Sequence, residues 1–313
     1  MENSRKIVVL DGDTLGKDVD LDFLSKFGDI KIYGRTLPEE TAERISGAEI
    51  VLTNKVILDR KILENAKSLK LIQITATGMN NVDLHSANEF GIAVKNVAGY
   101  STESVVQHTF SVLFYLLGSL KYQDNFVKEG AWTNSGIFTN VQSPFWEISG
   151  KTFGIIGFGT IGKRVAEVAS IFGAKAIYYS TSGKNSSEKF EQVSLKELLE
   201  KSDVISIHAP LNDQTKSLLN RDNLHLIANG KVLLNMGRGG IVNEVDIADE
   251  VEKRNLLFGT DVASTEPLPK ENPLQRIMNR SNVFITPHIA WASIEARKKL
   301  LKVVERNISS FIS

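Results

Sequence analysis

The chain has 313 residues, 42% hydrophobic and 24% charged, a balance typical of a globular protein with one large domain or two smaller ones. Its 37 basic and 37 acidic residues cancel, which disfavours a nucleic-acid binder that neutralises phosphates. It contains no cysteine, which excludes disulfides, thiolate nucleophiles and cysteine-ligated metals. Residues 1–5 are polar and resemble no signal peptide, and no apolar run is long enough to span a bilayer. We therefore expect a cytoplasmic protein.

Short apolar runs rich in β-branched residues alternate with amphipathic helical patterns along most of the chain. This alternation predicts α/β architecture, with parallel strands joined by right-handed crossovers. The eleven predicted strands cover residues 6–10, 29–33, 49–53, 71–75, 92–96, 151–157, 174–179, 204–209, 231–236, 257–261 and 283–286. Because so many strands exceed what one compact open sheet usually holds, we expect two sheets.

One long segment, residues 101–128, breaks this alternation. It contains no proline and only one glycine, Gly118, and its apolar spacing predicts a helix that is buried on most of its surface. We place a domain boundary near its start. Residues 291–313 predict a terminal helix with Lys and Arg on one face.

A glycine-rich turn follows the predicted strand at 151–156 and opens a predicted helix at 161–172. In this context the GxGxxG pattern indicates a dinucleotide site, because its glycines permit a tight turn, close backbone approach to a pyrophosphate and close helix packing. The amides at the helix start would bind the phosphates. The predicted contacts are Gly157, Gly159, Thr160, Ile161 and Gly162.

The end of the next strand, where an acidic residue commonly binds the adenosine ribose, carries Ser180. A carboxylate there would repel a 2′-phosphate, whereas Ser180 would not. Thr181 and Ser182 could donate hydrogen bonds to that phosphate, and Lys184 could neutralise it. Two interpretations remain open: the cofactor is NADP, or Ser180 binds the ribose hydroxyl of NAD and Lys184 is a solvated loop charge.

Three ionisable residues, Arg238, Glu266 and His288, each follow one of the successive strands at the end of the chain. Parallel α/β sheets bind ligands just beyond the carboxyl ends of their strands. Taken singly, each residue has a structural explanation as a surface charge, cap or packing residue. Together, and downstream of a phosphate loop, they predict a catalytic site.

The other histidines receive structural interpretations. His85 and His225 fall in helical patterns and are read as surface or packing residues, and His108 as a satisfied core residue. No metal site is predicted.

Over essentially its full length the chain resembles the D-isomer-specific 2-hydroxyacid dehydrogenases. The residues that carry this resemblance are Gly157-Phe-Gly-Thr-Ile-Gly162, His208-Ala-Pro-Leu211 with Thr215, Asn235-Met-Gly-Arg-Gly239, Asp261 with Glu266-Pro267, and Thr286-Pro-His-Ile-Ala290. Within the family, residues 10–16, 52–55, 76–78 and 99–108 look like the hydroxypyruvate reductase (glycerate dehydrogenase) branch.

The resemblance implies two Rossmann-like, doubly wound domains. A dinucleotide-binding domain at residues 99–290 would be inserted into a flavodoxin-like substrate-binding domain at residues 1–98 and 291–313. It also implies a homodimer formed largely by the cofactor domains, with the helix at 101–128 contributing.

The resemblance further implies a role for each site residue. Arg238 would bind the substrate carboxylate and keto oxygen, His288 would donate the proton in reduction, and Glu266 would pair with His288. Amides at Ala76, Thr77 and Gly78 would hold the carboxylate from the other domain. The cofactor, NAD or NADP, would also contact His208, Ala209, Pro210, Thr215, Met236, Gly237, Asp261 and Ala290.

The expected function is reduction of a small 2-keto acid, hydroxypyruvate first and glyoxylate second. Two alternatives stay open: another D-2-hydroxyacid dehydrogenase, such as a D-lactate dehydrogenase, and an NAD(H)-sensing, corepressor-like binding protein on the same scaffold. No nucleic-acid or membrane partner is expected. Substrate specificity would lie in loops such as residues 55–60 and 132–146.

Overall fold

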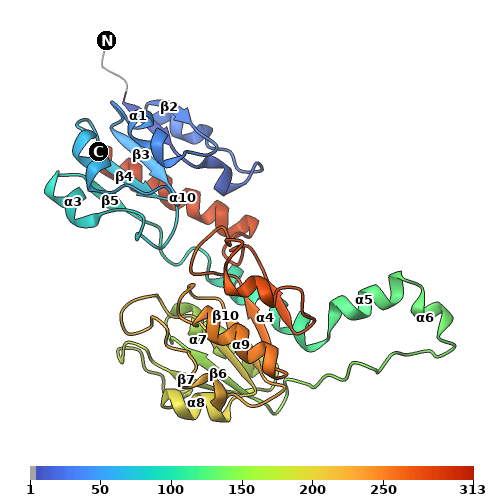
Figure 1. The fold of residues 1–313 in the computed structure, drawn as a ribbon. Helices are drawn as coiled ribbons and strands as arrows, with labels where there is room; N and C mark the ends of the chain where they lie inside the picture. The colour runs from blue at the N-terminus through green and yellow to red at the C-terminus, as the bar shows by residue number, and fades with distance from the viewer. Residues whose placement is uncertain (1–4) are drawn as a thin grey trace. The chain divides into compact units, whose positions relative to one another are not determined.

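The computed structural model describes residues 5–313, which form two compact units. Unit 1 contains the described residues up to Ser101 together with Ala292–Ser313, and unit 2 contains Thr102–Trp291. The chain therefore leaves unit 1, builds unit 2 and returns to unit 1 for its last helix, drawn in red in Figure 1.

Unit 1 is built on one sheet of five parallel strands in the flavodoxin-like order β2-β1-β3-β4-β5. All residues of β3 and β4 are buried, as expected for apolar strands that are covered on both faces. The strands are β1 (Lys6–Val9), β2 (Asp29–Ile32), β3 (Ile50–Thr53), β4 (Leu71–Ile74) and β5 (Ala93–Lys95).

The helices of unit 1 are mostly short, and the last one is the longest in the described chain. This terminal helix buries every fourth residue, namely Ala296, Leu300, Val304 and Ile308, and exposes its charged face. The elements are η1 (Gly12–Leu15), η2 (Asp22–Phe27), η3 (Pro38–Glu40), α1 (Thr41–Arg44), α2 (Arg60–Asn65), α3 (Leu84–Glu89) and α10 (Ile294–Ile312), where η marks a 3-10 helix.

Unit 2 contains a sheet of seven parallel strands in the order β12-β11-β10-β9-β6-β7-β8. The order of connection reverses between β6 and β9, which is the switch point where doubly wound sheets bind ligands. The strands are β6 (Thr152–Ile156), β7 (Lys175–Tyr179), β8 (Glu191–Gln192), β9 (Val204–Ile207), β10 (Val232–Asn235), β11 (Leu257–Thr260) and β12 (Val283–Ile285). The parallel α/β class expected from the sequence is confirmed.

Helices lie against this sheet and along its connections. Helix α4 packs closely, because a Cβ added at Gly259 of β11 would come within 2.5 Å of Val112 on that helix. The helices of unit 2 are α4 (Thr102–Leu117), α5 (Leu120–Lys128), α6 (Ala131–Asn134), α7 (Thr160–Ile171), α8 (Leu195–Lys201), η4 (Leu224–Leu226), α9 (Glu244–Lys253) and η5 (Pro273–Arg276).

The prediction of one buried helix over residues 101–128 was wrong. The helix ends before Gly118, and Ser119 adopts the left-handed conformation with φ 47°, so a second helix, α5, starts in a new direction. Helix α4 buries eight residues, whereas α5 buries none.

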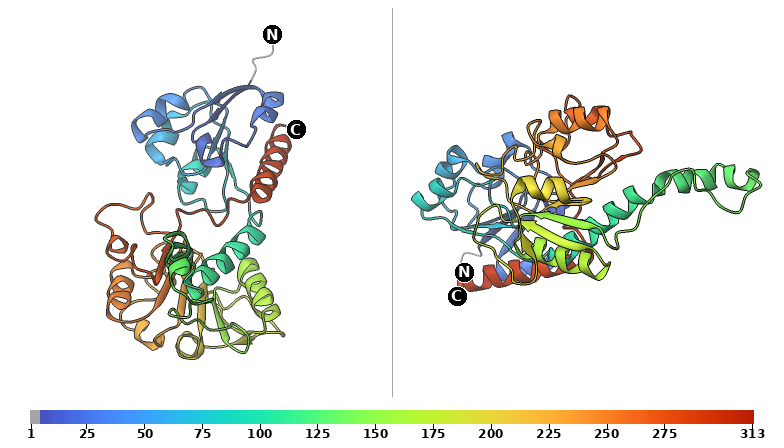
Figure 2. Two further views of the ribbon diagram at one scale, coloured as in Figure 1. Left: turned by 90° about the vertical axis from the view of Figure 1, so that its right-hand side faces the viewer. Right: turned by 90° about the horizontal axis from the view of Figure 1, so that it is seen from below.

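Residues 119–147 form an arm that reaches away from the sheet of unit 2 (Figure 2). Large apolar side chains on this arm are exposed, and Phe138 is 88% exposed. The other exposed apolar residues of the arm are Leu120, Val127, Trp132, Ile137, Val141 and Phe145.

Within the described chain, none of the helices combines the length and the apolar character that crossing a bilayer requires.

Candidate functional site

The glycine-rich turn joins β6 to α7 at the switch point of the unit 2 sheet. Gly157 has φ 91°, and a Cβ there would come within 2.7 Å of the Ala209 nitrogen, so the turn requires glycine. A Cβ at Gly162 would lie 2.2 Å from the Gly157 oxygen, which explains the close packing of the helix start. At Gly159 no atom lies within 4 Å of a Cβ, so the backbone faces open space.

This turn has the features of a phosphate cradle. Helix α7 has twelve residues, and its first amides at Thr160, Ile161 and Gly162 belong to the helix turn that lacks intrahelical acceptors. The positive end of the helix dipole lies at the same point. The turn can therefore bind an anion such as a pyrophosphate.

Ser180 lies directly after β7, and its hydroxyl is buried without a hydrogen-bond partner in residues 5–313. Thr181 follows it, half-buried, and Lys184 is exposed. A buried, unpartnered hydroxyl beside a phosphate cradle fits a bound ligand that supplies the missing partner.

The loop after β9 lies across the switch point from the glycine turn. The His208 side chain contacts the Ser206 hydroxyl through Nε2 at 2.8 Å, and its Nδ1 atom is buried without a partner within the described residues. Burial lowers the pKa of His208 to about 3, so the imidazole is neutral at physiological pH.

The remainder of that loop is fixed by Thr215. This residue is fully buried, and its hydroxyl donates to the Pro210 carbonyl at 2.6 Å. Ala209 is buried beside the glycine turn, and a Cβ at Gly237 would lie 2.9 Å from the Ala209 oxygen. Thr215 and Gly237 therefore shape the backbone of the switch point.

The three predicted catalytic residues follow three neighbouring strands of the same sheet. In the register of the sheet, Asn235 of β10 pairs with Thr260 of β11, which pairs with Ile285 of β12. Arg238, Glu266 and His288 therefore lie on loops that leave the same edge of the sheet. A hollow at this edge is lined by residues that include Leu211, Gly239, Gly240, Ser264 and Thr265.

His288 and Glu266 are in direct contact. The distance from His288 Nδ1 to Glu266 Oε2 is 2.6 Å, and the side chains are 22% and 31% exposed. Glu266 Oε1 accepts a hydrogen bond from the Ala263 amide at 3.1 Å, which fixes the carboxylate within its own loop. The pair can hold a proton while one edge of the imidazole ring stays accessible to a ligand.

The loop that carries Glu266 is anchored to the start of α9. Glu244 accepts hydrogen bonds from the Ser264 amide at 2.5 Å, from the Ser264 hydroxyl at 2.6 Å and from the Asn272 amide group at 2.7 Å. The sequence pattern does not indicate this role for Glu244, because Ser264 and Asn272 are distant from it in the chain.

The backbone around His288 is held by a buried carboxylate. His288 has φ 54°, a left-handed conformation that is unusual for a residue other than glycine. Asp261 is 1% exposed and accepts hydrogen bonds from the Ile289 and Ala290 amides, both at 2.8 Å. Asp261 therefore positions the segment that bears the imidazole.

Arg238 lies half-buried in the loop after β10. Its Nη1 donates to the Gly237 carbonyl at 2.9 Å, and its own carbonyl accepts from the Asn235 side chain at 2.9 Å. Met236, which precedes this turn, is buried in the core of unit 2.

Ala76, Thr77 and Gly78 belong to unit 1 and follow β4. The Thr77 hydroxyl donates to the Val97 carbonyl at 2.9 Å, and Asn96 donates to the Thr77 carbonyl at 2.6 Å. These bonds fix the turn at the carboxyl edge of the unit 1 sheet.

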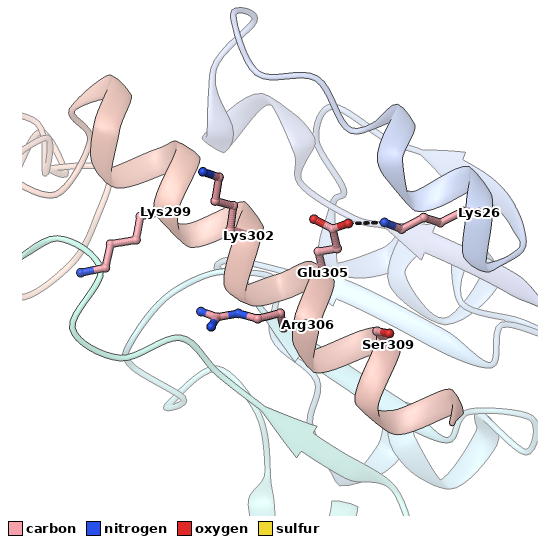
Figure 3. A pocket seen from close by; sticks show the side chains of 6 residues that line it. All are labelled: Lys26, Lys299, Lys302, Glu305, Arg306 and Ser309. Carbon is pink, nitrogen blue, oxygen red and sulfur yellow. Dashed lines mark hydrogen bonds and ion pairs between the residues drawn. The ribbon is translucent and has the colours of Figure 1, made fainter.

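Unit 1 also has a basic hollow along α10, shown in Figure 3. Its lining residues are Lys26, Lys299, Lys302, Glu305, Arg306 and Ser309, and Lys26 forms an ion pair with Glu305. The hollow contains neither a histidine nor any residue predicted to act in the site.

A family model described as "D-isomer specific 2-hydroxyacid dehydrogenase, NAD binding domain" matches residues 110–290. The chain is 36% identical over 315 residues to a hydroxypyruvate reductase of Blautia hydrogenotrophica, covering 98% of this chain and 97% of that protein.

Two solved structures share the fold of the whole chain. One is the D-lactate dehydrogenase of Aquifex aeolicus complexed with NAD and lactic acid, with a TM-score of 0.85, 26% identity and coverage of 98% of this chain and 95% of that one. The other is the acyclic imino acid reductase Bsp5 in complex with NADPH and D-Arg, with a TM-score of 0.85, 29% identity and coverage of 98% and 97%.

Proposed function

The chain belongs to the D-isomer-specific 2-hydroxyacid dehydrogenase family, and from this premise we propose that it reduces hydroxypyruvate to D-glycerate, with glyoxylate as a second substrate. The observation that carries the proposal is the contact between His288 and Glu266, on the sheet that also bears the phosphate cradle. The 36% identical relative named hydroxypyruvate reductase supports this choice of substrate.

The cofactor is a nicotinamide dinucleotide, since the family's NAD-binding domain covers residues 110–290. The cradle around Gly157 and Gly159 and the unpartnered Ser180 hydroxyl fit such a group. When bound, the nicotinamide supplies the hydride. The chain itself must orient the keto acid and provide a proton.

We assign the orientation of the substrate to Arg238. Its planar guanidinium can form two charge-assisted hydrogen bonds to a carboxylate, which fixes the direction of the keto acid as well as attracting it. The bond that Asn235 donates to the Arg238 carbonyl supports this role, because it holds the Arg238 backbone before a substrate binds. The guanidinium itself donates to the Gly237 carbonyl. For unit 1 we propose that the amides of Ala76, Thr77 and Gly78 bind a carboxylate.

We assign the proton to His288. Reduction of a ketone places negative charge on oxygen, and a proton from the Nε2 atom of His288 would neutralise it. The Glu266 carboxylate on Nδ1 fixes the orientation of the ring. In the oxidation direction the neutral ring would accept the proton from the hydroxyl group.

These assignments give each unit a role. Unit 2 would bind the cofactor and supply the proton, and unit 1 would contribute to substrate binding. The other proposed cofactor contacts, His208, Ala209, Pro210, Thr215, Met236, Asp261 and Ala290, all belong to unit 2.

For the cofactor we propose NADP in preference to NAD. Ser180 carries no charge that would repel a 2′-phosphate, and its buried hydroxyl is without a partner in residues 5–313. The exposed Lys184 lies four residues further on and can neutralise a phosphate there. The NADPH complex of the structurally similar Bsp5 reductase supports this preference.

We further propose that the protein is a homodimer assembled through the arm at residues 119–147. The arm exposes apolar side chains such as Phe138 and Val141, which are 88% and 76% exposed. Such surface is typical of a protein–protein contact.

A keto-acid panel with both reduced cofactors tests the proposal. We expect hydroxypyruvate to give the highest kcat/KM, glyoxylate to follow, and NADPH to be preferred over NADH. Oxidation of neither cofactor with any keto acid would refute catalysis and favour a nucleotide-sensing binding protein.

A further inference from the structure

Helix α4 contacts the loop that bears His288 at two points. His108 Nε2 lies 2.9 Å from the Thr286 hydroxyl, and the Ser104 hydroxyl donates to the Ala290 carbonyl at 2.6 Å. Thr286 and Ala290 lie on either side of His288 in the chain. Helix α4 therefore borders the segment that positions the proposed proton donor.

The hydrogen bonds of Thr286 fix the direction of its contact with His108. The Thr286 hydroxyl donates to Asp261 Oδ1 at 2.7 Å, so its oxygen must act as the acceptor toward the imidazole. The Nε2 atom of His108 is therefore the donor. It lies 3.6 Å from Asp261 Oδ1, too far for a good hydrogen bond, so the hydroxyl connects the two groups.

Asp261 also contacts the segment that bears His288. The same Oδ1 atom also accepts from the Ile289 amide, and Oδ2 accepts from the Ala290 amide. These two amides follow His288, whose left-handed backbone needs support from its surroundings.

We propose that His108 is a positioning residue for His288, acting through the Thr286 hydroxyl and the Asp261 carboxylate. The proposal rests on the function proposed for His288 as proton donor. By its donated hydrogen bond, His108 directs the Thr286 hydroxyl toward Asp261, and Asp261 clamps the two amides beyond His288. The imidazole of His288 is thereby kept against Glu266.

The electrostatic surroundings of His108 agree with this role. Burial lowers the pKa of His108, and the Asp261 carboxylate at the end of β11 opposes that effect. From the β12 side, the imidazole faces the neutral Thr286 hydroxyl. The lowered pKa favours the neutral imidazole, and the geometry requires that its proton be on Nε2.

Three variants test the proposal. His108→Leu removes the donor, His108→Gln keeps an amide donor near the position of Nε2, and Gln107→Leu adds leucine at a neighbouring exposed position of α4 as the control. For His108→Leu we expect kcat for keto-acid reduction to fall about 10-fold with little change in KM, because the proton donor is misplaced.

His108→Gln should restore kcat, and Gln107→Leu should resemble the wild type. Equal losses of kcat in His108→Leu and His108→Gln would indicate a packing role and overturn the proposal.

An isosteric substitution at Thr286 tests the same connection between His108 and Asp261. Thr286→Val removes the hydroxyl between His108 and Asp261, and we expect it to reproduce the His108→Leu profile. The double variant should be no worse than either single one, because one connection is broken in all three. If the losses of kcat in the two single variants multiply in the double variant, the proposed chain of contacts is wrong.

Hydrogen–deuterium exchange separates this inference from the proposed function, because it needs no activity. In His108→Leu the Ile289 and Ala290 amides should exchange faster, and in His108→Gln they should match the wild type. Unchanged protection in His108→Leu would overturn the inference even if the wild type reduces hydroxypyruvate. If the wild type is inactive, the proposed function is refuted. The exchange rates of the Ile289 and Ala290 amides then still test the contacts made by His108.

Discussion

His288 Nδ1 and Glu266 Oε2 are 2.6 Å apart, although the two residues come from loops that follow different strands. The contact occupies one nitrogen of the imidazole ring and leaves Nε2 as the nitrogen that we assign to the substrate oxygen. A carboxylate in this position sets the orientation of the ring.

Replacing the imidazole should remove most of the catalysis. For His288→Ala we expect kcat for hydroxypyruvate reduction to fall by roughly 10²–10⁴, the usual contribution of a positioned acid or base. Cofactor affinity, measured by fluorescence titration, should stay near the wild-type value. Turnover close to that of the wild type would exclude His288 as the proton donor.

Replacing the carboxylate should lower turnover. Glu266→Gln loses the charged acceptor that lies 2.6 Å from His288 Nδ1, so the imidazole is held less firmly and we expect kcat for hydroxypyruvate reduction to fall about 10-fold. Steady-state kinetics with hydroxypyruvate measure this change. An unchanged kcat would count against the pairing.

The shape of the cation at position 238 should matter as well as its charge. Arg238→Lys keeps the charge but loses the planar fork, so we expect KM for hydroxypyruvate to rise about 10-fold. Arg221→Lys is the matched control, since Arg221 pairs with Asp246 in the same unit. If KM is unaltered in Arg238→Lys, two-point binding of the carboxylate is wrong.

A charge at position 180 should reverse the choice of cofactor. Ser180→Asp would repel a 2′-phosphate and offer acceptors to a ribose, so KM for NADPH should rise about 10-fold or more, equivalent to ~1.4 kcal/mol. KM for NADH should fall or stay constant. A wild type that prefers NADH strongly would already contradict our assignment of NADP.

His208 should make stability depend on pH. Burial lowers its pKa to about 3 in the folded protein, while the unfolded chain binds the proton near pH 6.5. The unfolded state therefore takes up the proton first as pH falls, and the folded state loses stability from about pH 6.5 downward.

Urea unfolding at pH 7 and pH 5 measures this effect. Between these two pH values, His208→Gln should lose about 2 kcal/mol less free energy of unfolding than the wild type. The exposed His225→Gln is the control and should show no such difference. Equal pH dependence in His208→Gln and the wild type would show that His208 is protonated in the folded state.

The strands and the glycine turn were predictable because their determinants are local. Apolar runs mark buried strands, and the glycine pattern marks a turn in which a Cβ at Gly157 or Gly162 would collide with backbone atoms. The two-residue strand β8, Glu191–Gln192, was missed because it is polar and exposed. The break at Gly118 was missed because a single glycine within an apolar pattern does not by itself end a helix.

The position of the reacting side chains beyond neighbouring strands was also predictable, since sheet order brings together the ends of successive strands. The contacts that hold them in place were not. Glu244 reaches Ser264, and His108 reaches Thr286, over long separations in sequence, and no periodicity or motif encodes such hydrogen bonds. His108 was interpreted as a satisfied core residue, and the sequence did not indicate that its partner is Thr286 in the loop that bears His288.

Transfer of deuterium from the cofactor to the product tests the central claim most directly. The protein is given hydroxypyruvate and NADPH that carries deuterium at both positions of nicotinamide carbon 4, and the product is analysed by mass spectrometry and chiral chromatography. We predict D-glycerate that carries the deuterium on carbon 2. Glycerate without deuterium, the L-isomer, or no product at all would contradict the account.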